Sequence, residues 1–302
     1  MVGLLERFHS AAKTLGVALE IWDFADDKPW HPIAVAGLAK TVPAPRFAAP
    51  QFTDFMGKFA ADHKIDVVIP FIDSATVALA KAAPGLSASG VLPIVSRIEA
   101  CEAMADKAAS DKAFRDLGLR VPPPDRFPLL AKPRFGSSGR GIVTLESPED
   151  LAWWRARNTA DDFMIQSRIA GKEYSVDAYV DGAGRMLGAV SRVREVVSDG
   201  EAMITRTEHN AEALGITEKL LAWKMWRGPL TVQVMFDGTD GWLLECNPRF
   251  GSGATCSVEA GLAMPEWILR ERLGLPLPGK PIEWRDDLCM TRARKDYFLW
   301  LS

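Results

Sequence analysis

Short apolar runs alternate with amphipathic stretches along the first hundred residues. Three apolar, β-branched runs predict buried strands, at residues 17–22, 65–69 and 91–95. Residues 51–63 and 74–82 carry apolar side chains at helical spacing, and Pro84 is expected to end the second helix. Ser96 is expected to cap a third helix. Alternating strands and helices predict an α/β domain with a mostly parallel sheet.

The pattern changes after a helix predicted at residues 106–117. Three consecutive prolines, 122–124, form a stiff joint. Beyond it, pairs of strands are joined by glycine-containing turns, at residues 129–132 with 141–145, 173–181 with 185–193, and 230–237 with 241–246. Ser147, followed by a proline and two acids, predicts a capped helix start. Hairpins mixed with helices predict an α+β architecture for this part.

The charge balance excludes several classes of protein. The 36 lysines and arginines face 39 acidic residues, a formal charge of −3, which argues against nucleic-acid binding and polybasic membrane contact. No apolar run reaches the ~18 residues of a membrane span, and residues 1–13 do not resemble a signal peptide. The four cysteines form no C-x-x-C pair, so we expect packing thiols in the cytoplasm and no zinc site.

The loop inside the first hairpin has the chemistry of a phosphate cradle. Lys132 stands at its root, and its tip carries Gly136, Ser137, Ser138, Gly139 and Gly141. Glycines let backbone N–H groups approach an anion, the hydroxyls add donors, and the lysine adds a positive charge. Taken alone, such a loop is more often a flexible hairpin tip.

Polar side chains gather on the last hairpin. Gln233 lies on one strand, and Glu245 and Asn247 lie two residues apart on the other. Because residues i and i+2 of a strand face the same way, we predict oxygen ligands on one sheet face, a set that suits Mg²⁺. An exposed polar strand face is the alternative. Arg249 follows in a tight loop, where it is expected to face a phosphate or an anionic intermediate.

A third group of residues has the character of a nucleoside site. Gln166, Arg168 and Ile169 lie on or after a short strand, and Glu173 begins the next. A planar base needs apolar surfaces and a few hydrogen bonds. Glu173 is placed to accept from ribose hydroxyls, although a solvated charge at a strand start is the alternative.

The order and spacing of these elements resemble the ATP-grasp ligases. The branch is that of carbamoyl phosphate synthetase large subunits and biotin carboxylase, with D-alanine–D-alanine ligase as a cousin. The matching segments are Ala-Asp-Lys at 105–107, the loop at 132–141, residues 166–173, and residues 232–249 with Glu-Cys-Asn-Pro-Arg at their end. The resemblance covers about residues 60–270.

The resemblance implies a role for each motif. Its implied ATP ligands are Lys107, Lys132, Gly136, Ser137, Ser138, Gly139, Gly141, Gln166, Arg168, Ile169 and Glu173. Gln233, Glu245 and Asn247 would hold one or two Mg²⁺ (or Mn²⁺) ions. Arg249 and Lys132 would be the catalytic residues. Relatives often carry an acid where Gln166 stands, so this chain departs from them there.

The resemblance also implies a domain plan. Residues 1–105 would form a Rossmann-like α/β domain that precedes the ATP-grasp part, residues 106–170 the small ATP-grasp subdomain, and residues 171–302 the large α+β subdomain. Residues 3–8 already look like the domain's first helix. We therefore expect the first strand to be lacking, through a truncated or misannotated start or a trimmed first domain.

The implied reaction is an ATP- and Mg²⁺-dependent ligation through an acyl phosphate, with ADP and phosphate released. The substrates would be a small carboxylate and an amine or thiol, with no nucleic acid or membrane as partner and a homodimer left open. A kinase and a degenerate nucleotide-binding subunit are the alternatives. Arg192, Arg194 and Arg206 are candidate ligands of the carboxylate, unless they form surface ion pairs.

Overall fold

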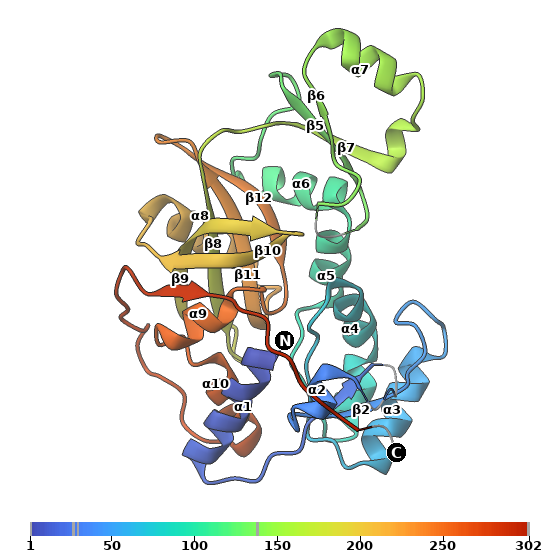
Figure 1. Ribbon diagram of the computed structural model, residues 1–302, viewed down its shortest axis with the longest axis vertical. Coiled ribbons are helices and arrows are strands. Elements are labelled where there is room, and N and C mark those ends of the chain that lie inside the picture. The colour runs from blue at the N-terminus through green and yellow to red at the C-terminus, as the bar shows by residue number, and fades with distance from the viewer. Residues whose placement is uncertain (1, 26–27, 29, 137–138, 301–302) are drawn as a thin grey trace.

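The computed structural model describes residues 2–25, 28, 30–136 and 139–300. Three regions can be distinguished in Figure 1. A small sheet with one helix stands at the top, and below it the large sheet lies to the left and the α/β region to the right of the view.

The α/β region contains short parallel strand pairs between helices. Its elements are α1 (Val2–Leu15), β1 (Trp22–Phe24), α2 (Pro32–Val35), β2 (Lys40–Val42), α3 (Phe52–Asp62), β3 (Val67–Val68), α4 (Asp73–Ala88), β4 (Leu92–Pro93) and α5 (Ile98–Ala105). β1 pairs with β2 and β3 pairs with β4, both in parallel. The predicted α/β character is confirmed.

Three local predictions in this region are wrong. The first strand begins at Trp22, not at residue 17, because only residues 22–24 find a partner strand. α4 continues through Pro84 to Ala88, since buried side chains such as Leu86 anchor it beyond the proline. Ser96 does not cap α5; its hydroxyl accepts a hydrogen bond from the Arg227 backbone N–H instead.

The first described helix packs mainly against helices of the C-terminal half of the chain. Leu4 and Phe8 of α1 are buried against Trp267 and Ile268 of α10 (Met264–Leu273). α1 therefore belongs to the side of the molecule that contains the large sheet. Figure 1 shows α1 and α10 side by side.

The small sheet carries the loop of interest. Its elements are α6 (Lys107–Asp116), β5 (Leu129–Pro133), β6 (Val143–Leu145), α7 (Pro148–Arg155), a 3-10 turn (Ala160–Asp162) and β7 (Phe163–Ser167). The strand order is β6-β5-β7, all antiparallel. The Ser147 hydroxyl accepts from the Asp150 N–H at 3.1 Å, so the predicted helix cap is confirmed.

The large sheet is antiparallel throughout, in the order β12-β11-β8-β9-β10-β13. The strands are β8 (Lys172–Val180), β9 (Met186–Ser198), β10 (Glu201–Thr207), β11 (Gly228–Phe236), β12 (Gly241–Asn247) and β13 (Cys289–Thr291). One face packs on α8 (Ala211–Leu221), and the other on α9 (Ala254–Glu259) and α10. The two predicted hairpins of this sheet are confirmed.

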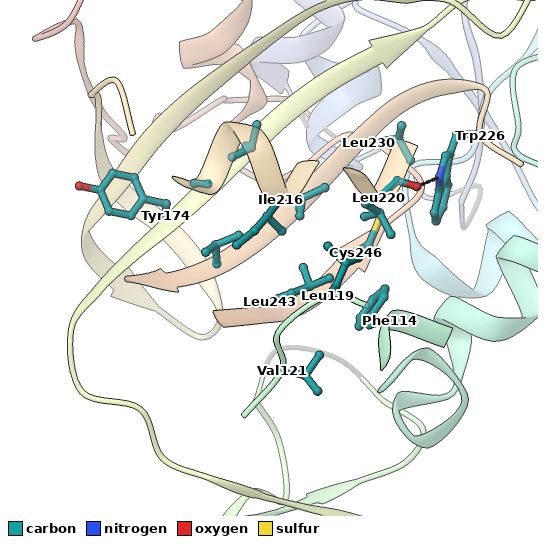
Figure 2. Close-up of a cluster of buried hydrophobic side chains, with 14 of the residues drawn as sticks. Phe114, Leu119, Val121, Tyr174, Ile216, Leu220, Trp226, Leu230, Leu243 and Cys246 are labelled. Atoms are coloured by element: carbon teal, nitrogen blue, oxygen red, sulfur yellow. Dashed lines mark hydrogen bonds between the residues drawn. The ribbon is translucent and has the colours of Figure 1, made fainter. Parts of the chain in front are cut away.

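A single apolar core joins the sheet to both α8 and α6. Figure 2 shows Phe114 of α6 beside Leu243 and Cys246 of β12, with Leu220 of α8 nearby. The Trp226 indole N–H donates to the Leu220 carbonyl at 2.9 Å. Residues 117–128 connect α6 to the small sheet, and Leu119 and Val121 of this segment belong to the same core, so the core holds α6 and the start of the connection against the large sheet. No helix in the described part of the chain is long and apolar enough to cross a bilayer.

Candidate functional site

One face of the large sheet carries a row of polar side chains. Val232 and Val234 of β11 point into the core under α8, so Gln233 between them faces the opposite side. Gln233 and Glu245 are direct cross-strand partners. The Asn247 amide nitrogen lies 3.0 Å from a Glu245 carboxylate oxygen and 3.4 Å from the Gln233 amide oxygen. The structure thus brings the three predicted metal ligands together.

The row continues across the two neighbouring strands. The Gln233 amide N–H donates to the Glu173 carboxylate at 2.7 Å, and the Arg194 guanidinium donates to the same oxygen at 2.5 Å. Glu173 of β8 is therefore hydrogen-bonded to side chains of both β9 and β11. Arg194 is paired within this row, so the structure does not present it as an unengaged ligand for a carboxylate.

Lys132 lies on β5 of the small sheet and is half-buried. Burial lowers the pKa of its ammonium group, and the carboxylates of Glu245 and Glu173 oppose that shift, while Lys107 adds to it. A half-buried ammonium group that these carboxylates help to keep charged is suited to bind a multiply charged anion.

Lys107 stands at the first position of α6 and reaches the glycine loop. Its ammonium donates to the Gly136 carbonyl at 2.7 Å, and its backbone N–H donates to the Arg134 carbonyl at 3.0 Å. The Asp106 carboxylate caps α6 by accepting from the Ala108 N–H, and it also pairs with the Arg134 guanidinium. These contacts hold the segments of Lys107 and Lys132 next to each other.

The loop needs its glycines for its backbone. Gly136, Gly139 and Gly141 have φ angles of 120°, 69° and 76°, a region that other residues rarely adopt. A Cβ on Gly141 would also lie 3.0 Å from the Pro133 ring. The predicted hairpin is confirmed by the pairing of β5 with β6. Ser137 and Ser138, which were predicted to bind phosphate, lie outside the described residues.

Gln166 has an unusual environment on β7. Its side chain is buried, and its amide N–H donates to the Asp111 carboxylate of α6 at 3.2 Å. Its amide oxygen is buried and has no partner among the described residues. A buried acceptor without a donor is costly, which favours a ligand N–H at this place.

The two residues after β7 leave the sheet. The Arg168 backbone N–H donates to the Pro128 carbonyl, its side chain is exposed, and Ile169 is half-buried. The structure therefore places both residues on the segment between the two sheets.

Arg249 does not face open space. It forms a two-pronged ion pair with Asp73 at the start of α4, with distances of 2.6 Å from Nε and 2.9 Å from Nη2. It also donates to the Phe250 carbonyl at 2.9 Å and lies 3.4 Å from the Asn247 amide oxygen. Asp73 was not singled out from the sequence, although its place after a parallel strand is a common one for functional side chains.

A buried network supports the loop that carries Arg249. The Asp177 carboxylate accepts from the Arg192 guanidinium at 2.8 Å and from the hydroxyls of Thr231 and Ser257 at 2.6 Å each. Arg192 is 1% exposed, so it is neither a substrate ligand nor a surface pair. A Cβ on Gly253 would meet its Nη1 at 2.4 Å, which shows how closely the loop backbone packs on the guanidinium.

Arg206 is also engaged within the chain. Its guanidinium pairs with Glu195, Glu208 and Asp287. These hydrogen bonds hold it on the rim of the large sheet, where it is unavailable to a substrate unless they break.

The donor chemistry of the row fits a hard divalent cation. Gln233, Glu245 and Asn247 offer only oxygen ligands, with a single carboxylate among them. Among the described residues no three or more His, Cys, Asp and Glu side chains gather as a metal cluster. A weakly charged oxygen set suits Mg²⁺, which takes much of its coordination from water and phosphate oxygens.

Residues 159–295 match the family described as ATP-grasp in the biosynthetic pathway with Ter operon. The matched segment contains β8 to β12 and the polar row. It ends within the C-terminal part, beyond β13.

Three solved structures are similar over most of the chain. The biotin carboxylase domain dimer of 2-oxoglutarate carboxylase from Hydrogenobacter thermophilus, in complex with MgADP, ADP and bicarbonate, has a TM-score of 0.71 at 16% identity and covers 92% of this chain and 69% of its own. N5-carboxyaminoimidazole synthetase from Staphylococcus aureus, complexed with ADP, has a TM-score of 0.70 at 16% identity. The match covers 93% of this chain and 77% of the synthetase. L-amino acid ligase from Bacillus licheniformis has a TM-score of 0.66 at 17% identity. The match covers 88% of this chain and 70% of the ligase.

These comparisons confirm the resemblance to ATP-grasp proteins, and a biotin carboxylase domain is among the structures of similar fold. The chain has the ATP-grasp fold, and the predicted mixed α/β class is confirmed. At identities of 16–17% the likeness to solved structures establishes the fold alone. The likeness to carbamoyl phosphate synthetase stays a prediction.

Proposed function

We propose that this chain is an ATP- and Mg²⁺-dependent ligase that joins a small carboxylate to an amine or thiol and releases ADP and phosphate. The observation that carries this proposal is the hydrogen-bonded row of Gln233, Glu245 and Asn247 on one sheet face, with Lys132 as the cation whose pKa burial lowers and the Glu245 carboxylate raises. A cation opposite a set of oxygen ligands is the arrangement that a metal-bound polyphosphate requires.

The nucleotide would lie between the two sheets. Lys107 and Lys132 would bind its phosphates, together with the loop of Gly136, Gly139, Gly141 and the two serines between them. The unpartnered Gln166 amide oxygen is suited to accept from the adenine amino group, because it lacks a donor among the described residues. Arg168 and Ile169 would contact the base through backbone groups, and Glu173 would accept from the ribose.

Gln233, Glu245 and Asn247 would hold Mg²⁺, or Mn²⁺ in its place. The bound ion would neutralise phosphate charge. The chain's own contribution is to orient the phosphates with Lys107 and Lys132, and to keep Glu173 in place through Arg194.

Two bond exchanges make up the proposed reaction. A substrate carboxylate oxygen bonds to the γ-phosphorus while the bond from that phosphorus to the β-bridging oxygen breaks, which gives an acyl phosphate and ADP. The nucleophile then bonds to the acyl carbon, phosphate leaves, and the nucleophile loses a proton. Arg249 would stabilise the anionic groups in both steps. Positioning and charge neutralisation suffice for such transfers, so no nucleophilic side chain is required.

The domain plan remains part of the proposal. Residues 1–105 would serve as the α/β domain before the ATP-grasp part, residues 106–170 as its small subdomain, and residues 171–302 as its large one. The expected setting is the cytoplasm, and a homodimer stays open.

Analysis of the nucleotide products tests the proposal. The purified chain is incubated with Mg-ATP and pools of carboxylic acids and amines, and ATP, ADP, AMP and phosphate are separated. We expect ADP and phosphate in equal amounts with a particular pool. ADP without phosphate would indicate a kinase, AMP would contradict the proposal, and binding without turnover would favour a degenerate nucleotide-binding subunit.

Glu245→Ala should lower this ADP release by at least about 100-fold, because it removes the single carboxylate of the proposed metal site. Glu218→Gln is the matched control, since Glu218 is exposed on α8, across the sheet. Equal loss in both variants would rule out a specific role for Glu245.

A further inference from the structure

Asp73 occupies two hydrogen-bond donors of the Arg249 guanidinium, so a substrate cannot bind to them while this ion pair is intact. Asp73 accepts from Nε and Nη2, the two donors that a guanidinium offers to a carboxylate in a forked pair. The Arg249 side chain is 18% exposed and the Asp73 side chain 35%. A substrate carboxylate can reach this face of Arg249 only by displacing Asp73.

An apolar pocket opens at the start of α4, where it is lined by Ser74, the residue that follows Asp73. Its volume is about 570 Å³, and its lining includes Phe24, Pro43, Ala44, Phe47, Ala48 and Ser74. Ala25 directly follows β1, Pro43 directly follows β2, and Ser74 is the second residue of α4. These segments leave the carboxyl ends of the parallel strands, where open α/β sheets bind their ligands. The exposed Arg46 stands at the rim.

Charge balance selects among the small carboxylates. A plain carboxylate on Arg249 would leave Asp73 unpaired beside a second negative group, and an amine on Asp73 would leave Arg249 unpaired. A zwitterion satisfies both, because its carboxylate replaces Asp73 on Arg249 while its ammonium replaces Arg249 on Asp73. One internal ion pair is then exchanged for two with the ligand.

We propose that the carboxylate substrate is an α-amino acid with a large apolar side chain, and this rests on the ligase function proposed above. Its carboxylate pairs with Arg249, its ammonium pairs with Asp73, and its side chain enters the pocket between Phe24 and Phe47. The pocket has room for an aromatic or branched aliphatic group. Asp73 also keeps the α-amino group protonated, so that it does not compete with the second substrate as nucleophile.

The first test measures binding without ATP, by calorimetry at neutral pH. The probes are L-phenylalanine, 3-phenylpropionate, which lacks the amine, and 2-phenylethylamine, which lacks the carboxylate. We expect L-phenylalanine to bind at least about 10-fold more tightly than either analogue. In Asp73→Asn its advantage over 3-phenylpropionate should fall below about 3-fold, whereas Asp54→Asn, an exposed change on α3, should leave it unaltered.

The second test fills the pocket. Ala48→Trp should weaken L-phenylalanine and L-leucine by at least about 10-fold and leave glycine unaffected. Ala61→Trp, also at an exposed alanine of the same region but away from the pocket, is the control. Both alanines are exposed, so neither change removes a core contact.

Several outcomes would overturn the proposal. The first is equally tight binding of L-phenylalanine and 3-phenylpropionate. The second is failure of both L-phenylalanine and L-leucine to bind. The third is an Ala48→Trp variant that binds L-phenylalanine and L-leucine as tightly as the wild type does. ADP release with carboxylates that lack an amine would overturn it while the ligase function stands. Selective binding of L-phenylalanine without ADP release would keep the amino-acid site and contradict the ligase function.

Discussion

At the scale of single residues, the buried Arg192 shows how much one position depends on its surroundings. It lies on β9, its guanidinium pairs with Asp177, and both side chains are at most 2% exposed. The ion pair is completed by Thr231 and Ser257, so every oxygen of the carboxylate has a donor. Because Gly253 packs on the guanidinium, the pair supports the loop that carries Arg249.

Arg192→Met should lower the free energy of unfolding by about 3–5 kcal/mol, because the buried Asp177 carboxylate loses its counter-charge. The double variant Arg192→Met with Asp177→Asn should recover part of that loss, since no unpaired charge remains. Urea denaturation of both variants measures the two values. A single-variant loss below about 1 kcal/mol would contradict the importance of this pair.

At the scale of elements, the start of α6 is tied to the end of β5. Asp106 caps α6 and pairs with Arg134, just after β5. Lys107 is the first residue of α6, and Lys132 lies near the end of β5. The contact between these two elements therefore sets the spacing of the two lysines. The hydrogen bonds from Arg134, more than any other contact, lower the pKa of the Asp106 carboxyl below its usual value.

Asp106→Ala should destabilise the chain by about 1 kcal/mol or more, through loss of the cap and the ion pair. Asp106→Asn retains a cap and should cost less. A group with a lowered folded pKa stabilises above its unfolded pKa and loses that effect as pH falls through the folded value. The difference between wild type and Asp106→Asn should thus be full at pH 6 and shrink below the ordinary aspartate pKa of 3.8.

Urea unfolding at several pH values measures this difference. Asp116→Asn, which removes an exposed pair with Lys112 on the same helix, is the control and should change stability little. A difference that does not depend on pH would exclude the ion pair as its cause.

At the scale of the whole molecule, the proposed nucleotide site draws on two separate sheets. Lys132 belongs to the small sheet, and Glu245 and Asn247 belong to the large one. The small sheet has its own core of Leu129, Ala131, Leu145 and Trp154. A ligand that binds both lysines and the polar row therefore links two separately packed parts of the chain.

Mg-ATP at 100 times its Kd should stabilise the chain by about 2.7 kcal/mol. ATP with excess EDTA should stabilise it less, because the polar row then lacks the cation that joins it to the phosphates. Thermal unfolding with each ligand measures the effect, and Glu245→Ala should remove the difference between them. Equal stabilisation with and without Mg²⁺ would contradict the metal role of this row.

The local pattern of the sequence was enough to predict part of the polar row. Strand alternation puts Glu245 and Asn247 on one face, because the period of a strand is a local property. The hairpins and the Ser147 cap were predictable for the same reason. Gln233 joins the two through a register shift in the hairpin, which pairs it with Glu245 while Val234 pairs with Leu243. β10, β13 and the helices beyond α7 were not predicted from the sequence.

Only the tertiary structure decided which distant groups meet. Asp73 and Arg249 are 176 positions apart, and their contact depends on how the α/β region packs against the end of β12. The same holds for Gln166 with Asp111 and for the burial of Arg192. Periodicity tells which way a side chain points from its own element, whereas its partner is set by the packing of elements that are remote in sequence.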